Sequence, residues 1–252
     1  MLEVHVLASG SDGNCIVVRT EEGSFMVDAG LNGKQLTGLM GKVGVEGGDI
    51  SAILLSHEHV DHVRGAGVLS RKYGIPVMGN SHTLSRSDIG KVDYQHFKTM
   101  MPFKLAGMEV SPLPTSHDAL EPNAFLIRDR DRSLLIATDT GVMTAPVEEA
   151  LKEVDLAIIE SNYDDKMLID GPYPIYLKRR IASECGHLSN IDCGISLRNT
   201  MGNGRRIFLA HLSKNNNTPD SARDTVARIT GIKRMNIDCL EFPGDYRTLR
   251  VL

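Results

Sequence analysis

The sequence predicts one α/β domain over residues 1–252, in which two β-sheets pack face to face between outer layers of helices. Short apolar runs typical of buried strands alternate with segments of helical periodicity along the chain. In both halves several of these runs end on polar residues, so the halves look equivalent. No low-complexity linker or change in composition marks a domain boundary. We therefore expect a four-layer αββα sandwich with its functional site at one edge.

In the first half of the chain, short apolar runs bounded by turn residues predict the strands, and apolar residues at helical spacing predict the helices. The expected strands are Leu2 to Leu7, Cys15 to Arg19, Ser24 to Val27, Ala52 to Leu55, Ile75 to Met78, and a pair over Phe103 to Leu113 that breaks at Gly107. The expected helices are Asn32 to Val43, a segment from Asp61 to Ser70, and Ser81 to Ser87. The second and third strands form a hairpin, because Glu21-Glu22-Gly23 between them is turn-prone.

The second half repeats this alternation of strands and helices. The expected strands are Ala124 to Ile127, Leu134 to Ala137, Leu156 to Ile159, Ile207 to Ala210 and Ile237 to Phe242. The expected helices are Pro146 to Val154, Leu177 to Cys185, Asn190 to Asn199 and Thr218 to Thr230. Thr218 is a good N-cap because its hydroxyl accepts a backbone hydrogen bond and Pro219 suits the first helical turn.

Composition limits the classes of function. The net charge is −4, so no bulk positive field favours nucleic acid, although bound divalent cations would make a site locally positive. The four cysteines are scattered and include no Cys-x-x-Cys pair, which favours reduced thiols in a cytoplasm over disulfides or a zinc knot. We find no signal peptide and no membrane-spanning run. The sequence therefore predicts a cytoplasmic protein that does not bind membranes.

The densest cluster of chemically active residues follows the apolar run Ala52 to Leu55. It comprises His57, His59, Asp61 and His62. His57 and His59 are two residues apart, so an extended backbone directs both imidazoles to one side. Imidazole suits zinc, iron and related ions, and carboxylates suit harder cations, so this pattern predicts a metal site. The alternative, a solvated polar turn, is much less consistent with three histidines at this spacing.

Four further polar residues follow strands or lie in loops rich in glycine and serine: His117, Asp139, His187 and His211. Each histidine taken alone is more often structural than functional. Asp139 in Thr-Asp-Thr-Gly has the alternative role of a turn or cap residue. Their shared placement favours a role in the site, since loops at strand ends converge there. A carboxylate at Asp139 is also able to bridge two cations.

These motifs resemble the metallo-β-lactamase superfamily in order and spacing over nearly the whole chain. The matching residues are His-x-His-x-Asp-His at 57–62, Ser116-His117-Asp118, Thr138 to Gly141 and Ala210 to Ser213. The resemblance implies an αββα sandwich and two divalent metal ions. It places His57, His59 and His117 on one metal and Asp61, His62 and His211 on the other, with Asp139 and a hydroxide between them. Zinc is the expected metal, with manganese or iron as alternatives.

Further motifs indicate which branch of the superfamily the chain resembles. Gly186 to Asn190 resembles the His-Ser-Thr-type motif of the tRNA 3′-processing endonucleases, which implies that His187 is a general acid; the alternative is a histidine that caps a helix. The runs 9–14, 160–164, 171–174 and 211–217 resemble the YycJ/WalJ subfamily, which is associated with DNA exonuclease activity. Asp61 is the candidate to orient or deprotonate the nucleophile. No β-CASP insert, tRNA arm or cysteine-rich zinc site is evident.

The expected function is a binuclear phosphodiesterase or nuclease that acts on DNA. The alternatives are a hydrolase of thioesters, lactones or cyclic phosphodiesters, and a metal-dependent binding module without turnover. Ser213, Asn215 and Asn216 are candidate donors to substrate phosphate, or equally a solvated turn. The sequence also contains a basic patch, which either contacts the backbone of a nucleic acid or is a solvated face. Its residues are Lys178, Arg179, Arg180, Arg205 and Arg206. The oligomeric state is not predicted.

Overall fold

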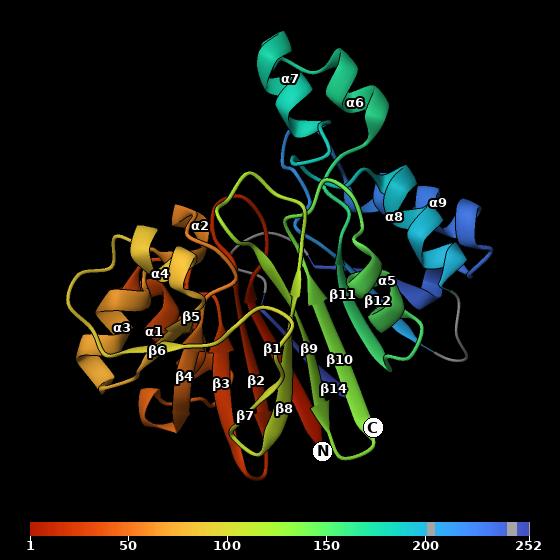
Figure 1. The fold of residues 1–252 in the computed structure, drawn as a ribbon. Helices are drawn as coiled ribbons and strands as arrows, with labels where there is room; N and C mark the ends of the chain where they lie inside the picture. The colour runs from red at the N-terminus through yellow and green to blue at the C-terminus, as the bar shows by residue number, and fades with distance from the viewer. Residues whose placement is uncertain (201–204, 241–245, 252) are drawn as a thin grey trace.

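The computed structural model describes residues 1–200, 205–240 and 246–251. Two sheets, each of seven strands within this described part, pack face to face, and helices cover their outer faces (Figure 1). This arrangement confirms the predicted αββα sandwich. In Figure 1 both chain termini lie at the bottom of the sandwich, at the end opposite to α6 and α7.

The first sheet contains mainly the N-terminal half of the chain. Its strand order is β14 (Arg247–Val251), β1 (Leu2–Ala8), β2 (Cys15–Thr20), β3 (Gly23–Val27), β4 (Ile50–Leu54), β5 (Val77–Gly79) and β6 (Tyr94–His96). Strands β1 to β3 are antiparallel, whereas β3 to β6 run parallel. The carboxyl ends of β3 and β4 therefore lie side by side.

The second sheet has the order β13 (Ile237–Cys239), β12 (Arg206–Ala210), β11 (Leu156–Glu160), β10 (Arg132–Ala137), β9 (Asn123–Asp129), β8 (Met108–Pro114) and β7 (Phe103–Leu105). Strands β10 to β13 run parallel. The carboxyl ends of β10, β11 and β12 consequently meet at one edge, which is where open α/β sheets place their sites.

Helices alternate with the parallel strands. They are α1 (Gly33–Lys42), α2 (Val60–Val63), α3 (Ala66–Tyr73), α4 (Ser81–Arg86), α5 (Ala145–Leu151), α6 (Asp165–Asp170), α7 (Ile175–Ile181), α8 (Asn190–Asn199) and α9 (Pro219–Thr230). Short 3-10 turns lie at Gly47–Asp49 and Arg234–Asn236. The Thr218 side chain accepts from the Ser221 backbone N–H, so the predicted cap of α9 is confirmed. No helix in the described ranges is long and apolar enough to cross a membrane.

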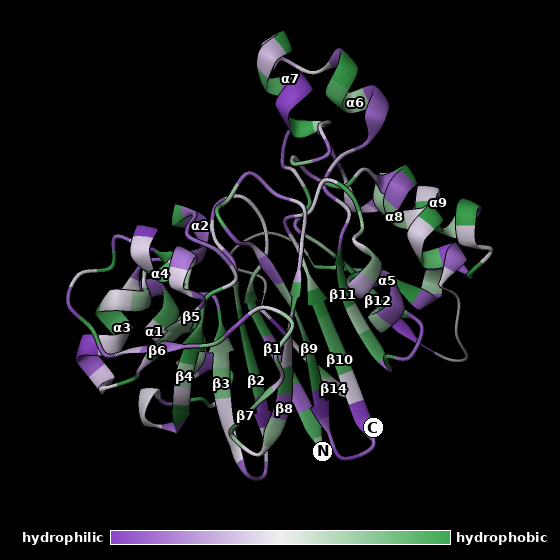
Figure 2. Cartoon of the chain, viewed as in Figure 1, coloured by the Kyte–Doolittle hydropathy of each residue, from purple (hydrophilic) through white to green (hydrophobic). Residues whose placement is uncertain are grey.

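Three apolar layers hold the sandwich together, visible as green strands and helix faces in Figure 2. The central layer lies between the sheets and includes Phe25, Phe125 and Phe208, each almost fully buried. A second layer joins the first sheet to α1 and α3, and a third joins the second sheet to α5, α8 and α9. Burial on both faces explains why the parallel strands read as continuous apolar runs.

The structure differs from the sequence prediction at several elements. The helix expected from Asp61 to Ser70 is divided into α2 and α3 around Gly65, whose Cβ position would lie 2.4 Å from the Leu31 carbonyl oxygen. The helix expected from Leu177 to Cys185 is α7, which begins at Ile175 and ends at Ile181, and α6 was not predicted. Strand β13 ends at Cys239, and Phe242 lies outside the described residues. The closing strand is instead β14, which pairs with β1.

Candidate metal centre

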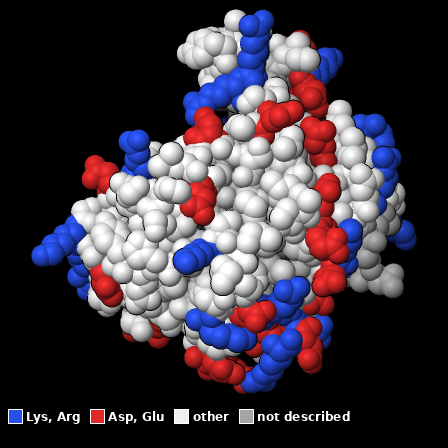
Figure 3. All heavy atoms as spheres, viewed as in Figure 1, with Lys and Arg blue, Asp and Glu red and all other residues white. Residues whose placement is uncertain are grey.

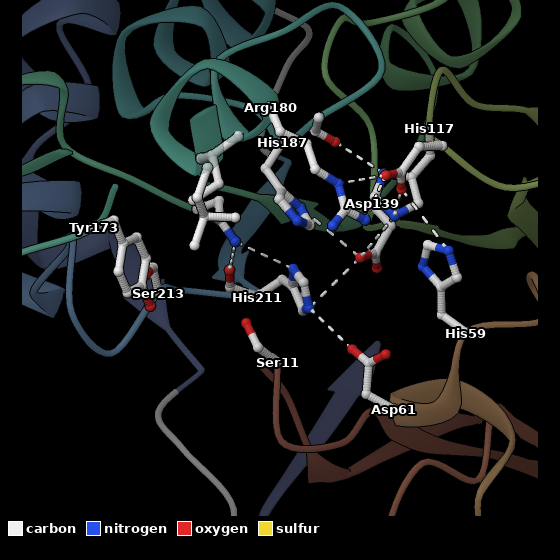
Figure 4. Close-up of a pocket in the computed structure, with 15 residues that line it drawn as sticks. Ser11, His59, Asp61, His117, Asp139, Tyr173, Arg180, His187, His211 and Ser213 are labelled. Atoms are coloured by element: carbon white, nitrogen blue, oxygen red, sulfur yellow. Dashed lines mark hydrogen bonds and ion pairs between the residues drawn. The ribbon is translucent and has the colours of Figure 1, made fainter. Parts of the chain in front are cut away.

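All seven predicted metal ligands meet at the edge where the two sheets present their loops. His57, His59, Asp61 and His62 follow β4 and enter α2 from the first sheet. The second sheet supplies His117 after β8, Asp139 after β10 and His211 after β12. His187, between α7 and α8, lies beside them (Figure 4). Residues from both halves of the chain therefore form one cluster.

The possible metal ligands of this cluster form overlapping groups, of which two correspond to the predicted metal sites. The His57, His59 and His117 atoms lie within 4.8 Å of one another, and so do those of Asp61, His62 and His211. Asp139 lies between the two groups. One oxygen, Oδ1, is 3.9 Å from His117 Nε2 and 3.6 Å from His211 Nε2, while Oδ2 is 3.3 Å from His62 Nε2. This position suits a carboxylate that bridges two cations.

Five imidazoles of the site share one orientation: each engages Nδ1 with a protein oxygen and leaves Nε2 for the interior of the site. The Nδ1 partners are Ser56 Oγ for His57 (3.0 Å), Asp28 Oδ2 for His62 (2.8 Å), the Gly186 carbonyl for His117 (2.9 Å), and Glu160 Oε1 for both His187 (2.8 Å) and His211 (3.0 Å). Oxygen partners at Nδ1 are the usual way to fix the tautomer of a metal-ligating histidine.

Several potential metal-ligand atoms in the cluster lack the hydrogen-bond partners that buried polar atoms normally have. His57 Nε2, His211 Nε2 and Asp139 Oδ2 are all buried and make no hydrogen bond within the described residues. Burying a polar group without a partner costs about 1–3 kcal/mol. His62 Nε2 lies 3.0 Å from the Asn14 amide nitrogen. The unsatisfied atoms and the nitrogen and oxygen donor set fit divalent metal ions.

The carboxylate of Glu160, at the end of β11, was not predicted as a site residue. It is fully buried and accepts from both His187 and His211 through Oε1, while Oε2 accepts from the Thr140 N–H at 2.7 Å. Although burial alone would raise the pKa of Glu160, the imidazoles of His187 and His211 hold it well below its usual range. An ionised Glu160 therefore orients a predicted metal ligand and the predicted general acid together.

A second unpredicted carboxylate, Asp28, supports the first sheet's side of the site. Its oxygens accept from the Ser56 backbone N–H (2.8 Å), the Ser56 hydroxyl (2.8 Å) and His62 Nδ1. Asp28 follows β3, whose neighbour β4 carries the histidine cluster. Both carboxylates share the sequence signal of Asp139, a position at a strand end, and Glu160 also begins the run 160–164 that resembles the YycJ/WalJ subfamily.

Three residues of the site adopt a left-handed backbone at the ends of strands: Asp28 (φ 58°), Asp139 (φ 58°) and His211 (φ 55°). L-residues rarely adopt this conformation, and it costs most for side chains other than Gly, Asn and Asp. Such local strain is found where a functional site requires a particular side-chain direction. Here each sharp turn directs a strand-end side chain into the cluster.

In the absence of metal, burial and the neighbouring charges determine how tightly each histidine of the cluster holds its proton, with which a metal ion must compete. Burial lowers the pKa of His57 well below its ordinary value, and the neighbouring histidines lower it further. Burial alone would also lower the pKa of His211, but Asp139, Asp61 and Glu160 raise it to about 10. The pKa of His62 is raised in the same way by Asp139, Asp28 and Asp61. Because a histidine ligand must be neutral, metal binding displaces these protons and becomes weaker as the pH falls.

An open pocket of about 260 Å³ lies directly over the cluster. Figure 4 shows His59 at one end and Tyr173 and Ser213 at the other. Of the predicted phosphate contacts, Ser213 lines the pocket, whereas Asn215 donates to the Tyr173 hydroxyl at 2.7 Å. Asn216 is fully buried and its amide donates to Ser213 Oγ at 3.2 Å, so it supports Ser213 and does not face the pocket.

The five basic residues of the predicted patch do not lie together. Lys178, Arg179 and Arg180 are on α7, and Arg180 donates to Asp118 at 2.7 Å beside His117. Arg205 instead donates to the backbone carbonyls of Leu151, Thr200 and Leu197. Arg206 begins β12, at the strand end opposite to His211. Only the α7 part of the patch adjoins the pocket.

Comparison with known proteins agrees with this site. The family model described as the metallo-β-lactamase superfamily matches residues 8–89. The chain is 38% identical over 234 residues to "Exodeoxyribonuclease YycJ" of Bacillus anthracis, a match that covers 90% of this chain and 89% of that protein. The chain belongs to this metallo-β-lactamase family. "Exodeoxyribonuclease WalJ" of Streptococcus pneumoniae (strain D39) is also 38% identical, over 88% of this chain and 85% of the relative.

A solved structure with the metallo-β-lactamase fold aligns over the whole molecule. The protein YhfI of Bacillus subtilis superposes with a TM-score of 0.76 and covers 98% of this chain and 99% of its own, at 18% sequence identity. This likeness concerns the fold alone. Metallo-β-lactamase proteins use divalent metal ions, and the His and Asp groups described above are compatible with a binuclear site.

We expect Glu160→Gln to weaken zinc binding by about 10–100-fold, the usual cost of losing a group that orients a ligand. The amide would present N–H groups either to Thr140 N–H or to the two Nδ1–H donors, so at least one hydrogen bond would be lost. Zinc titration against a competing chelator measures the effect. Glu149→Gln, at an exposed helix position paired with Lys152, is the matched control. Unchanged zinc affinity in a folded Glu160→Gln protein would contradict the role of Glu160.

Proposed function

We propose that this protein is a binuclear metal-dependent phosphodiesterase that removes nucleotides from DNA. The observation that carries the proposal is the complete His/Asp cluster beneath an open pocket in a chain whose 38%-identical relatives are named exodeoxyribonucleases. In this proposal His57, His59 and His117 hold one metal, Asp61, His62 and His211 hold the other, and Asp139 binds both. Such ions activate water and neutralise charge at a phosphoryl group.

The protein's own side chains have separate tasks in this proposal. The Nδ1 partners hold the imidazoles rigid, so the ligand geometry is formed before substrate binds. Asp61, whose side chain is 19% exposed, orients the attacking nucleophile or accepts its proton. Although burial would raise the pKa of Asp61, His62 and His211 lower it, so its carboxylate is ionised and able to accept a hydrogen bond from the nucleophile.

His187 is the proposed general acid. Its side chain is 22% exposed at the pocket, and its Nδ1 is held by Glu160. With Nδ1–H bound to Glu160, the proton that the ring donates in its imidazolium form is the one on Nε2. The acceptor is the leaving oxygen of the phosphodiester. Ser213 is the proposed hydrogen-bond donor to a phosphate oxygen.

The ligand set and the cysteines also support proposals for the metal, the domain organisation and the location of the protein. Nitrogen ligands outnumber carboxylates, which favours zinc, with manganese or iron as alternatives. Both halves of the chain contribute ligands to one site, so we treat residues 1–252 as one domain. Cys15 and Cys193 are buried free thiols and Cys185 is an exposed free thiol, which supports a cytoplasmic location.

The proposal predicts cleavage of an end-labelled DNA duplex and of bis(p-nitrophenyl) phosphate by protein reconstituted separately with zinc and manganese. An Asp139→Asn variant, purified in parallel, controls for contaminating nucleases. Cleavage of both substrates that is lost in the variant supports a DNA phosphodiesterase. Cleavage of the small diester alone favours a small-molecule phosphodiesterase, and no cleavage of either favours a thioester or lactone substrate.

A further inference from the structure

The helices α6 and α7, with the loops around them at residues 164–185, form a lobe that stands apart from the sandwich (Figure 1). We call this segment the α6–α7 lobe. Helix α7 has no buried residue, and α6 buries only Leu168. Ile169, Ile175 and Tyr176 are 70%, 64% and 70% exposed. The lobe therefore contributes little to the core, and its apolar side chains remain available for another contact.

Polar contacts at its base fix the lobe above the pocket. Arg180 donates to Asp118, Asn215 donates to the Tyr173 hydroxyl, and the Ser221 hydroxyl donates to Asp164 at 2.7 Å. The end of α7 also reaches the catalytic residues, because the Ile181 carbonyl accepts from the His187 N–H at 2.9 Å. A surface fixed at this many points is preorganised for a ligand.

The side of the lobe that faces the pocket presents three apolar or aromatic side chains beside Arg180. Leu177 and Ile181 are four residues apart on α7, so they project from the same face of the helix, and both line the pocket with Tyr173. We call these three residues the apolar wall. In Figure 4 Tyr173 lies at the end of the pocket opposite to His59. The pocket thus combines a charged end, where the ligands gather, with an apolar end.

We propose that the apolar wall is a nucleobase subsite, where the base of one nucleotide at a DNA strand end stacks while its phosphodiester lies at the His/Asp cluster. This inference rests on the proposed function. Stacking on aromatic and apolar side chains accepts every base, as a nuclease without sequence preference requires. The volume of about 260 Å³ lies just below the roughly 300–1,000 Å³ of ordinary ligand pockets, so it suits one nucleotide at a strand end.

Positively charged side chains near the apolar wall are suited to bind the phosphates in the rest of the DNA strand. Figure 3 shows Lys and Arg side chains over the lobe at the top of the molecule. Arg180 lines the pocket itself and its side chain is 62% exposed, so its guanidinium is accessible to a phosphate next to the bound base. Apolar contact for a base beside a cation for a phosphate is the combination found in single-strand binding sites.

The test compares substrates that share a p-nitrophenol leaving group but differ in the presence of a base: thymidine 5′- and 3′-p-nitrophenyl phosphates against methyl p-nitrophenyl phosphate. We expect the wild-type protein to prefer at least one thymidine ester. The double variant Leu177→Ala/Ile181→Ala should reduce this preference, mainly through KM. The range of about 5- to 150-fold for one base stacked on an aromatic ring applies to Tyr173→Ala. Calorimetry with thymidine monophosphate and inorganic phosphate should show the same selective loss in binding.

Matched variants distinguish the effect of the apolar wall from the effect of the rest of the α6–α7 lobe. Tyr176→Ala and Ile175→Ala alter exposed side chains of α7 that do not line the pocket, and they should leave the preference unchanged. Tyr173→Phe keeps the ring and should retain the preference, whereas Tyr173→Ala should reduce it. Circular dichroism and zinc content verify that each variant is folded and loaded.

The outcomes distinguish the two proposals. A selective loss for the thymidine esters and thymidine monophosphate supports the subsite. Equal rates for all esters in the wild type, or an equal loss for all of them in the double variant, overturns the subsite and leaves the phosphodiesterase proposal intact. No cleavage of any ester by metal-loaded wild-type protein overturns the proposed function and the subsite with it.

Discussion

Replacing Asp139 by asparagine is expected to reduce the bound metal from two ions to one or none and to lower phosphodiester hydrolysis by more than about 100-fold. Losing a residue that only supports a ligand costs about 10–100-fold, so losing a carboxylate between both metal groups should exceed this range. The Asp139 oxygens lie 3.3 to 3.9 Å from nitrogens of His62, His211 and His117. Among the described residues, Asp139 is the only carboxylate that belongs to two groups of possible metal ligands, one with His57 and His62 and the other with Glu160, His187 and His211.

Asparagine is the informative substitution because it separates charge from backbone effects. Asp139 has a φ of 58°, a left-handed conformation that asparagine tolerates but alanine does not. The side chain keeps its shape, and one amide oxygen remains as a weaker, neutral ligand. A loss of metal in Asp139→Asn therefore reports on the missing negative charge and not on a disturbed strand end.

Metal content by elemental analysis and kcat/KM on bis(p-nitrophenyl) phosphate measure this effect. Asp131→Asn, at the exposed turn between β9 and β10, is the control for an amide introduced at the other end of β10. Full occupancy by two metals with undiminished turnover in Asp139→Asn would remove Asp139 from the centre of the site.

The site also shows what the sequence is able to predict and where it fails. The ligands were identified because metal-binding residue types follow apolar runs, and parallel strands bring their carboxyl ends to one edge. Asp139 was identified by this reasoning together with its Thr138 to Gly141 motif. Glu160 and Asp28 occupy equivalent positions, but their roles depend on which strands are neighbours. Glu160 reaches His211 because β11 lies between β10 and β12, an order that local pattern does not specify.

Elements outside the core were harder to predict for a related reason. Periodicity indicates a helix near Leu177. It does not indicate that α7 buries none of its residues and stands over the pocket. Strand β14 pairs with β1 from the opposite end of the chain, for example at Thr248 with His5. Such pairing between distant segments leaves no local signal. Asn216 is similar, since only the folded loop shows that its side chain is buried beneath Ser213.

His187→Ala is expected to lower DNA hydrolysis by about 10²–10⁴-fold, the usual contribution of a general acid. The effect should depend on the leaving group. A nucleotide leaves as a poor alkoxide that needs a proton, whereas p-nitrophenolate leaves readily without one. We therefore expect less than a tenfold loss on bis(p-nitrophenyl) phosphate. Paired kcat measurements on an oligonucleotide and on this diester give the ratio directly.

Two controls keep this prediction specific. His82→Ala removes an exposed histidine on α4 whose side chain is 67% exposed and should leave both rates unchanged. Metal content must also be measured, because His187 lies within ligand distance of Asp139, Glu160 and His211. Retention of two metals with a selective loss on DNA is the signature of a proton donor. Loss of a metal would identify His187 as a ligand, and an equal loss on both substrates would contradict the role of general acid.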